Sequence, residues 1–365
     1  MPYSSRRGFA LSSLGVAGSG LAPSGARATR APLLYDVTAY GAKGDGTSLA
    51  TAAIQRAVDA AHASGGGVVL FPPGRYLSGT IELKSRVCLH LTAGAIIAGS
   101  KRLEDYPERT PAARSYTDLY TRRSLIYAEG QEETGIEGAG TLDVQGTAFS
   151  GPYLVRPYMI RMINCRRVHV QGVTLLDSPM WVQHYLLCQD TVIDGVTVHS
   201  RVNHNNDGID IDSCQRVRIA NCDIWSGDDA IVLKSTTAEP CRDVTVSNCV
   251  ISSRCNAIKL GTESNGGFVN IAVSNCSIYD TRLAGIALEC VDGGALDGVN
   301  ISNIVMRDTG CPIFIRLGDR GRPFEPAQAR WPAGHLRNVT ISNVQATGEF
   351  VWNLATRDLA EVMNQ

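Results

Sequence analysis

The 365-residue sequence lacks strong net charge, long apolar runs and many aromatic residues. Lysine and arginine number 34 against 35 acidic residues, a formal net charge of −1, so no field of one sign would draw the whole chain to nucleic acid or an anionic membrane. No apolar run approaches the roughly 18 residues that a transmembrane helix needs. With 44% hydrophobic and 19% charged residues, the composition also excludes a disordered or collagen-like chain. We expect a soluble, monomeric protein with one large domain and neither nucleic-acid nor membrane partners in its mature form.

Glycine, in contrast, is abundant, at 37 residues, while aromatic residues make up only 6%. This balance favours many short strands joined by tight turns and argues against a helix bundle.

The first 28 residues have the pattern of an export signal. Arg6-Arg7 precedes a stretch rich in small residues over positions 9–22, and the small-x-small cleavage pattern of residues 26–28 follows it. This predicts a bacterial twin-arginine signal peptide over residues 1–28 and a mature domain over residues 29–365. The mature protein would then be periplasmic or secreted. A tail with a chance arginine pair is the alternative.

Short segments that alternate apolar and polar residues repeat along the body of the chain. Their spacings are 23, 26, 27, 27, 28 and 40 residues, and the segments are 167–173, 190–196, 216–222, 243–249, 270–276, 298–304 and 338–344. A near-constant period of short strands is typical of a solenoid and predicts one coil of a parallel β-helix per repeat. The spacing of 40 predicts an inserted loop over residues 318–334.

Asparagine and cysteine recur at fixed positions of this repeat. We expect an internal ladder of stacked amides from Asn221, Asn248, Asn275, Asn303 and Asn343. The cysteines form two columns, Cys222, Cys249 and Cys276, and Cys165, Cys188, Cys214 and Cys241. Because they lie about one coil apart rather than in Cys-x-x-Cys pairs, buried free thiols of the core are favoured over a zinc site.

Both ends of the solenoid are expected to be covered. Residues 50–63 predict a capping helix with apolar positions at helical spacing, and residues 68–71 would then begin the first rung. At the other end, the alternating pattern stops after Val344 and residues 347–365 form a helix-prone tail, expected to pack across the last rung.

Three aspartates fall together in the repeat. When the strands that follow them are aligned, Asp207, Asp229 and Asn256 stack on three successive rungs, with Asp228 beside Asp229. Carboxylates this close repel one another when all are ionised, so at least one pKa should rise, as a general acid requires. Aspartate is also a common turn residue, but turn formation explains only one acid per rung. The cluster therefore favours acid/base catalysis.

Five motifs carry a resemblance to a known family. They are Asn205-Asn206-Asp207-Gly208, Gly227-Asp228-Asp229, Gly140-Thr141-Leu142-Asp143, Arg156-Pro157, and Ser178-Pro179-Met180-Trp181 with His184 close by. Together they resemble the pectin-cleaving glycoside hydrolases of family 28, the polygalacturonases and rhamnogalacturonases, over residues 35–344. The resemblance implies an all-β fold, a right-handed, single-stranded parallel β-helix of the pectin lyase-like type with an N-terminal capping helix. It also implies inverting hydrolysis of a pectic polysaccharide or oligosaccharide without a cofactor or metal.

The resemblance further implies a role for each acid. Asp228 is similar in position to the general acid that protonates the glycosidic oxygen, and Asp207 and Asp229 to the pair that deprotonates the attacking water. Around them we expect substrate contacts from six residues: His184, Asn205, Asn256, Lys259, Glu289 and Arg316.

Two stretches depart from the family pattern. Where polygalacturonases carry Gly-His-Gly, this chain has Cys255-Asn256-Ala257, and where they carry the cationic fork Arg-Ile-Lys it has Ala287-Leu288-Glu289. These differences favour another pectic linkage, such as the mixed rhamnose-galacturonate backbone. Lys234, Lys259 and Arg316 could hold a carboxylate from another side, or be solvated charges of a strand face.

Two other functions remain open. A calcium-dependent pectate lyase would use the aspartates to bind the metal and would release an unsaturated product. A non-catalytic carbohydrate-binding β-helix would bind sugar and release no reducing ends.

Overall fold

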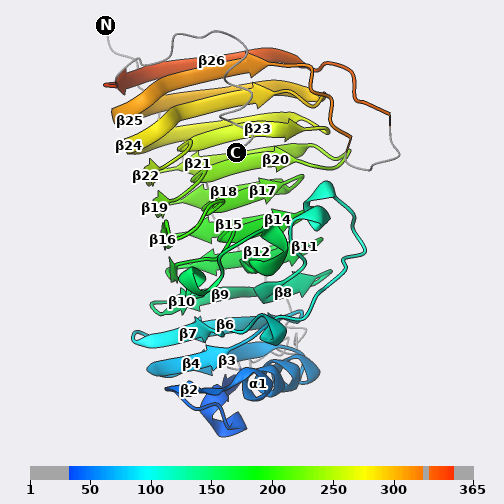
Figure 1. Ribbon diagram of the computed structural model, residues 1–365, viewed down its shortest axis with the longest axis vertical. Coiled ribbons are helices and arrows are strands. Elements are labelled where there is room, and N and C mark those ends of the chain that lie inside the picture. Colours follow the sequence, from blue (N-terminus) through cyan, green and yellow to red (C-terminus); the bar gives the residue numbers. More distant parts are fainter. Residues whose placement is uncertain (1–32, 324–328, 349–365) are drawn as a thin grey trace, which may run out of the picture. The chain divides into compact units, whose positions relative to one another are not determined.

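Parallel strands stacked rung upon rung make up most of the computed structural model, which describes residues 33–323 and 329–348 (Figure 1). The predicted signal peptide and the end of the predicted tail, residues 349–365, lie outside the described residues. The described residues contain one long α-helix and five short 3-10 helices: α1 (Thr51–Ala63), η1 (Val37–Tyr40), η2 (Leu103–Asp105), η3 (Tyr116–Leu119), η4 (Gly146–Ala148) and η5 (Tyr153–Val155). No helix in this part of the chain is long and apolar enough to cross a membrane.

The strands form three parallel stacks, here named sheets A, B and C. Sheet A contains β1 (Leu34–Asp36), β3 (Gly67–Phe71), β6 (Val87–Leu91), β9 (Gly135–Gly138), β12 (Arg166–Gln171), β15 (Gln189–Asp194), β18 (Gln215–Ala220) and β21 (Cys241–Ser247). Sheet B contains β2 (Asp45–Leu49), β4 (Gly74–Ser78), β7 (Ala95–Gly99), β10 (Thr141–Asp143), β13 (Thr174–Leu176), β16 (Thr197–Ser200), β19 (Asp223–Ser226) and β22 (Val250–Ser253). Sheet C contains β5 (Ile81–Glu82), β8 (Ser124–Glu129), β11 (Tyr158–Ile163), β14 (Gln183–Leu186), β17 (Ile209–Asp212), β20 (Ile231–Ser235) and β23 (Ile258–Ser264).

The last three strands are long enough to run through more than one sheet. They are β24 (Phe268–Cys290), β25 (Ala295–Leu317) and β26 (His335–Ala346). Each coil thus visits sheets A, B and C in turn, and the chain forms the predicted right-handed, single-stranded parallel β-helix.

The predicted register of the repeat is confirmed. One interior column of sheet A runs through paired residues of seven successive strands, Val168, Thr191, Val217, Val244, Ile271, Val299 and Val339. Because side chains alternate between the two faces of a strand, every second residue of each repeat enters this core. The predicted inserted loop connects β25 to β26, and its residues 324–328 lie outside the described part.

The asparagine column exists, but the expectation that it is internal is wrong. All five side chains are exposed at the corner between sheets A and B, and each residue has a positive φ of 50 to 57°. Asparagine adopts this left-handed conformation more readily than other non-glycine residues, which explains its recurrence. Neighbouring amides still bond: Asn303 donates to Asn275 (3.1 Å) and Asn343 to Asn303 (2.7 Å).

The two cysteine columns are buried in the core as predicted, and all eleven cysteines are free thiols. Within residues 33–323 and 329–348, no column cysteine belongs to a group of side chains close enough to hold a metal ion. These thiols therefore pack as small core residues.

The predicted N-terminal helix is confirmed as α1, which buries its expected apolar face against the first coils. The buried residues are Ala53, Ile54, Ala57, Val58 and Ala61. The prediction that residues 68–71 begin the first rung is wrong, because β1 already pairs with β3 and β2 with β4. The helix follows β2 and occupies the place of a sheet C strand in the first coil (Figure 1).

Candidate active site

The predicted acids meet where the chain turns from sheet B into sheet C. Asp207 precedes β17, Asp228 and Asp229 connect β19 to β20, and Asn256 precedes β23. Backbone bonds from Gly208 N to Asp229 O and from Ala230 N to Asn256 O, both 2.9 Å, hold these turns on successive rungs. The structure therefore brings the three aspartates together as predicted.

Two residues of the recognised motifs fix the turn that carries Asp207. The fully buried Asn206 side chain donates to Ser178 O (2.7 Å) and Met180 O (3.2 Å). Arg156 donates to His204 O (2.5 Å) and to Asn205 Oδ1 (2.9 Å). These contacts explain why motifs distant in the sequence occur together, since they position Asp207 without being part of its chemistry.

The acids open onto a cleft whose wall carries balanced charge and an aromatic side. Its charged lining residues are Asp207, Asp228, Asp229, Glu263, Lys234, Lys259, Arg320 and Arg322. The remaining lining residues are Tyr120, Tyr153, Trp181, Asn205, Cys255 and Thr262. A polar cleft with aromatic side chains along one side suits a hydroxyl-rich ligand better than an apolar one.

Asp229 has the contacts of an ionised carboxylate. Its Oδ1 accepts hydrogen bonds from the side chain of Asn256 (2.7 Å) and its backbone (3.2 Å), and Lys259 Nζ lies 3.1 Å from Oδ2. Burial acts to raise the pKa of Asp229, but the charges of Lys259 and Lys234 and the bond from Asn256 hold it below its ordinary value.

Asp228 has the opposite behaviour, although it is the preceding residue. Burial, followed by the negative charge of Asp229, raises the pKa of Asp228 above its ordinary value. Its Oδ1 accepts a hydrogen bond from the Asp229 backbone N–H (2.9 Å). Asp228 therefore keeps its proton to a higher pH than an exposed aspartate, which is the property of a general acid.

Asp207 is nearly completely buried, and Lys234 Nζ lies 3.8 Å from its Oδ2. Burial and the charges of Asp228 and Asp210 raise the pKa of Asp207 well above its ordinary value. Within this pair the pKa of Asp207 is thus raised and that of Asp229 is lowered.

Lys234 lines the cleft, and the sequence left open whether it holds a carboxylate or is a solvated charge of a strand face. Its Nζ lies 3.5 Å from both Asp210 and Glu263 and 4.7 Å from the centre of the Trp181 ring. Burial acts to lower the pKa of Lys234, but the charges of Asp210 and Asp207 raise it above its ordinary value. Lys234 therefore stays charged and balances the buried acids.

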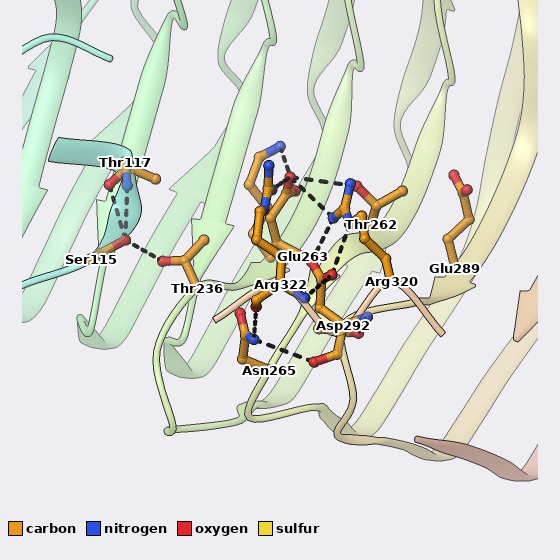
Figure 2. A network of polar contacts seen from close by, with 12 residues as sticks. Ser115, Thr117, Thr236, Thr262, Glu263, Asn265, Glu289, Asp292, Arg320 and Arg322 are labelled. Carbon is orange, nitrogen blue, oxygen red and sulfur yellow. Dashed lines mark hydrogen bonds and ion pairs between the residues drawn. The ribbon is translucent and has the colours of Figure 1, made fainter. Parts of the chain in front are cut away.

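Arg320 and Arg322 are functional candidates that the sequence analysis missed. Arg320 Nε donates to Asp292 Oδ1 (2.7 Å), and Arg322 Nη2 lies 2.8 Å from Glu263 Oε1. Figure 2 shows both arginines beside Glu263, and the side chain of Asn265 also bonds Arg322 O (2.6 Å). Both arginines come from the inserted loop of residues 318–334, so the spacing of 40 was the available signal.

Tyr120, Tyr153 and Trp181 form the aromatic side of the cleft. The Tyr120 ring centre lies 4.8 Å from that of Tyr153 and 5.6 Å from that of Trp181. Only Trp181 belongs to a motif seen in the sequence. Tyr120 and Tyr153 lie in segments without periodicity, where sequence alone gives little signal.

Of the six predicted substrate contacts, only Asn205 and Lys259 line the cleft. Asn256 is buried and positions Asp229 instead. Arg316 lies on the strand adjacent to Glu289 and is not among the lining residues.

His184 and Glu289, both expected to contact substrate, are not among the residues that line the cleft and lie behind Trp181 and Lys259, which do. His184 is fully buried, stacks on Tyr158 and lies 3.3 Å from Asp212 Oδ2 through Nε2. Glu289 (Figure 2) is also fully buried, with Lys259 Nζ 3.8 Å from Oε1. Burial raises the pKa of Glu289, and neither residue can touch a sugar in the cleft without a rearrangement.

One group of side chains in the cleft is close enough to be considered as a calcium site. Asp228, Asp229 and Cys255 offer one ligand atom each within 4.8 Å of one another. Calcium, however, takes six to eight oxygen ligands, whereas a thiol is one of these three donors and Lys259 already neutralises Asp229. The donor set is therefore wrong for calcium-dependent elimination.

Comparison with known proteins agrees with the fold and with the family that the motifs indicated. The family model described as "Glycosyl hydrolases family 28" matches residues 71–356, and the one described as "Rhamnogalacturonase A/epimerase, pectate lyase-like" matches residues 34–91. A "Probable polygalacturonase" of Vitis vinifera is 35% identical over 217 residues, which cover 54% of this chain and 43% of the relative.

Two further relatives point the same way. The "Exo-poly-alpha-D-galacturonosidase" of Dickeya chrysanthemi is 26% identical over 257 residues, with 56% of this chain and 42% of the relative covered. The crystal structure of an exopolygalacturonase from Thermotoga maritima has the same fold, with a TM-score of 0.75, 24% identity and coverage of 87% of this chain and 83% of that one. The chain spans less than half the length of the two curated relatives.

Proposed function

The chain belongs to family 28 of the glycosyl hydrolases, and from this membership we propose that it hydrolyses O-glycosidic bonds in the backbone of a pectic polysaccharide or oligosaccharide. The observation that carries the proposal is the opposite displacement of two neighbouring pKa values at the cleft wall. The pKa of Asp228 is raised and that of Asp229 is lowered, which is the arrangement that lets an acid and a base coexist at the same pH.

The proposed reaction is a single displacement with inversion. Asp228 donates its proton to the glycosidic oxygen as the bond to the anomeric carbon breaks. A water molecule attacks the opposite face of that carbon and gives a proton to Asp229, the base of the Asp207–Asp229 pair, which later releases it to solvent. The sugar leaves with a new reducing end of inverted configuration, and Asp228 regains a proton from solvent.

Lys234 and Asn256 support this chemistry without touching the reacting atoms. Lys234 offsets the charge of Asp207 and Asp210, and Asn256 holds Asp229 through two hydrogen bonds to one oxygen. The second oxygen of Asp229 faces Lys259. The base is thereby oriented before substrate binds, which is the arrangement that electrostatic preorganisation requires.

The proposed substrate has both acidic and neutral sugars, as in the rhamnose-galacturonate backbone. The position of the family's cationic fork is buried here, since Ala287 and Glu289 are both fully inaccessible. Arg320 and Arg322 instead supply accessible positive charge from the inserted loop, with 27% and 37% of their side chains exposed. The cleft thus has positive charge from the inserted loop but no accessible cationic fork. This suits a polysaccharide in which sugars that carry a carboxylate alternate with neutral sugars.

The aromatic side of the cleft supplies the remaining recognition. Tyr120, Tyr153 and Trp181 offer ring faces against which the apolar face of a sugar ring can pack. Tyr120 comes from the segment between β7 and β8. Binding by these side chains depends little on the charge of the sugar.

Product analysis on polygalacturonan, rhamnogalacturonan and their oligomers tests the proposal. We expect new reducing ends, no ultraviolet-absorbing unsaturated product, and faster release from the mixed backbone than from polygalacturonan. An unsaturated product would establish a lyase. Sugar binding without any reducing ends would establish the non-catalytic alternative. Polygalacturonan as the preferred substrate would overturn the assignment of the mixed backbone alone.

A further inference from the structure

A second cluster of reactive side chains lies on the outer face of sheet A, on a different sheet from the aspartates. Cys88 of β6, Glu137 of β9 and His169 of β12 each offer one ligand atom, and these atoms all lie within 4.8 Å of one another. The three strands are successive rungs, paired β6 to β9 and β9 to β12. The cluster therefore joins three coils and takes no part in the proposed hydrolysis.

Gly135 makes this meeting possible. In the register, Cys88 pairs with Gly135 and Gly135 pairs with His169, so a glycine separates the thiol from the imidazole. A Cβ at Gly135 would lie 2.6 Å from His169 Nδ1, closer than side chains tolerate. Because Gly135 has no Cβ, the imidazole of His169 can lie over β9, and its Nε2 is 3.3 Å from Cys88 Sγ.

The separations are those of ligands around a single ion. Cys88 Sγ lies 3.3 Å from His169 Nε2, and His169 Nε2 lies 3.7 Å from Glu137 Oε2. A tetrahedral zinc site with bonds of about 2.0 to 2.3 Å has edges of about 3.4 to 3.6 Å between its ligand atoms. Two of the three separations thus lie within a few tenths of an ångström of these edges, and the third, from Cys88 Sγ to Glu137, is at most 4.8 Å.

His90 contacts the oxygen of the Glu137 carboxylate that does not face His169. Its Nδ1 lies 3.0 Å from Glu137 Oε1, which leaves Oε2 directed to His169. Such an outer contact orients a ligating carboxylate and is typical of metal sites in proteins. The side chains of His90, Glu137 and His169 are 30 to 36% exposed, so an ion can enter from solvent.

We propose that Cys88, Glu137 and His169 bind Zn²⁺, with His90 positioning Glu137 and one coordination position open to water. A thiolate and an imidazole select zinc over calcium or magnesium, which take oxygen ligands. The ion would link three successive coils through ligands that are up to 81 residues apart in sequence. Because the three ligands converge only in the folded chain, zinc binding stabilises the fold.

Calorimetric titration of the metal-stripped full chain with Zn²⁺ tests the site. A Cys255→Ser background removes the other group of three donors, Asp228, Asp229 and Cys255, from the measurement. In that background we expect one ion per chain and a higher melting temperature with zinc. Cys88→Ser and His169→Gln should each weaken zinc binding by at least about 100-fold, and His90→Gln by about 10- to 100-fold.

Cys311→Ser is the matched control, because Cys311 is also a partly exposed thiol but lies on β25. It should leave zinc affinity unchanged. Titration with Co²⁺ gives a second readout, since a thiolate ligand produces a charge-transfer band that Cys88→Ser should abolish. Absence of zinc binding, or an affinity that Cys88→Ser and His169→Gln leave unchanged, would overturn the proposal.

Discussion

At the scale of single residues, the environment of each carboxyl group decides its role. Asp228 and Asp229 are adjacent in sequence, yet their pKa values move in opposite directions. The difference lies in their partners. Lys259 and Asn256 contact Asp229 and lower its pKa, whereas burial and the charge of Asp229 raise the pKa of Asp228. Charge repulsion alone predicted that at least one pKa would rise, and only the family resemblance indicated Asp228 as the general acid.

Replacing Lys259 by methionine tests this assignment. The lysine charge holds the pKa of Asp229 below its ordinary value, so its loss should raise that pKa. Asp229 must be ionised to accept a proton from water, and therefore the acidic limb of the pH profile of kcat/KM should move to higher pH. Lys43→Met, at an exposed surface position, should leave the profile unchanged. An unmoved acidic limb in Lys259→Met would remove Asp229 from the role of base.

Individual residues also show where motif reasoning fails. His184 stands close to a recognised motif, but it is fully buried beside Asp212. A motif indicates that residues recur together and does not distinguish contact with substrate from support of the turn. Asn205, Asp207, Asp228, Asp229 and Lys259 do line the cleft, and strand register accounts for the stacking of the aspartates.

At the scale of elements, the repeats were the predictable part of the fold. Each interior column needs an apolar residue at every second position, and this requirement is visible in sequence. The first coil was missed because β1 and β2 are short and do not match the repeat. Arg320 and Arg322 were missed for a related reason: a loop that folds over a cleft has no period from which its position can be read.

The corner between sheets A and B gives a test at this scale. Asn248 has a φ of 56° and is exposed, so its side chain contributes mainly by tolerating that conformation. Asn248→Ala should be less stable than Asn248→Gly by about 1 kcal/mol, because both lose the side-chain hydrogen bond and only alanine is strained at positive φ. Thermal unfolding of the two variants measures the difference. Equal stability would show that backbone conformation does not select asparagine at this corner.

The inserted loop gives a second test. Arg322→Ala should raise KM for a galacturonate-containing substrate by about tenfold or more, since hydrogen bonds to charged groups contribute about 1.5 to 3 kcal/mol. Steady-state kinetics on charged oligomers measures the effect. Arg337→Ala is the control, because Arg337 is 61% exposed on β26 and pairs with Asp297 on sheet A. An effect equal to that of the control would remove Arg322 from substrate recognition.

At the scale of the whole molecule, the solenoid places catalytic turns on adjacent coils and leaves the connections between strands free to differ. The acids come from two successive rungs, while the cleft wall extends from Tyr120 to Arg322. Family membership therefore follows from the coils, and specificity is expected to follow from the loops.

Export of the full chain is a prediction at this scale. If residues 1–28 are a twin-arginine signal, replacing Arg6 and Arg7 by lysine should leave the precursor in the cytoplasm of an expressing bacterium, because the transport machinery reads that pair. Cell fractionation and immunoblotting measure the distribution. Arg27→Lys, outside the pair, should be exported normally. Undiminished export of the double variant would contradict a twin-arginine route.

The central claim is that Asp228, Asp207 and Asp229 hydrolyse a pectic backbone with inversion. Time-resolved proton NMR of the first products from a rhamnogalacturonan oligomer tests it most directly, with the unmodified protein and Asp228→Asn in parallel. The account predicts that the new reducing end first appears in the configuration opposite to that of the bond cleaved. It also predicts a rate at least about 100-fold lower in Asp228→Asn with little change in KM. A product of retained configuration, or near-normal turnover in Asp228→Asn, would contradict it.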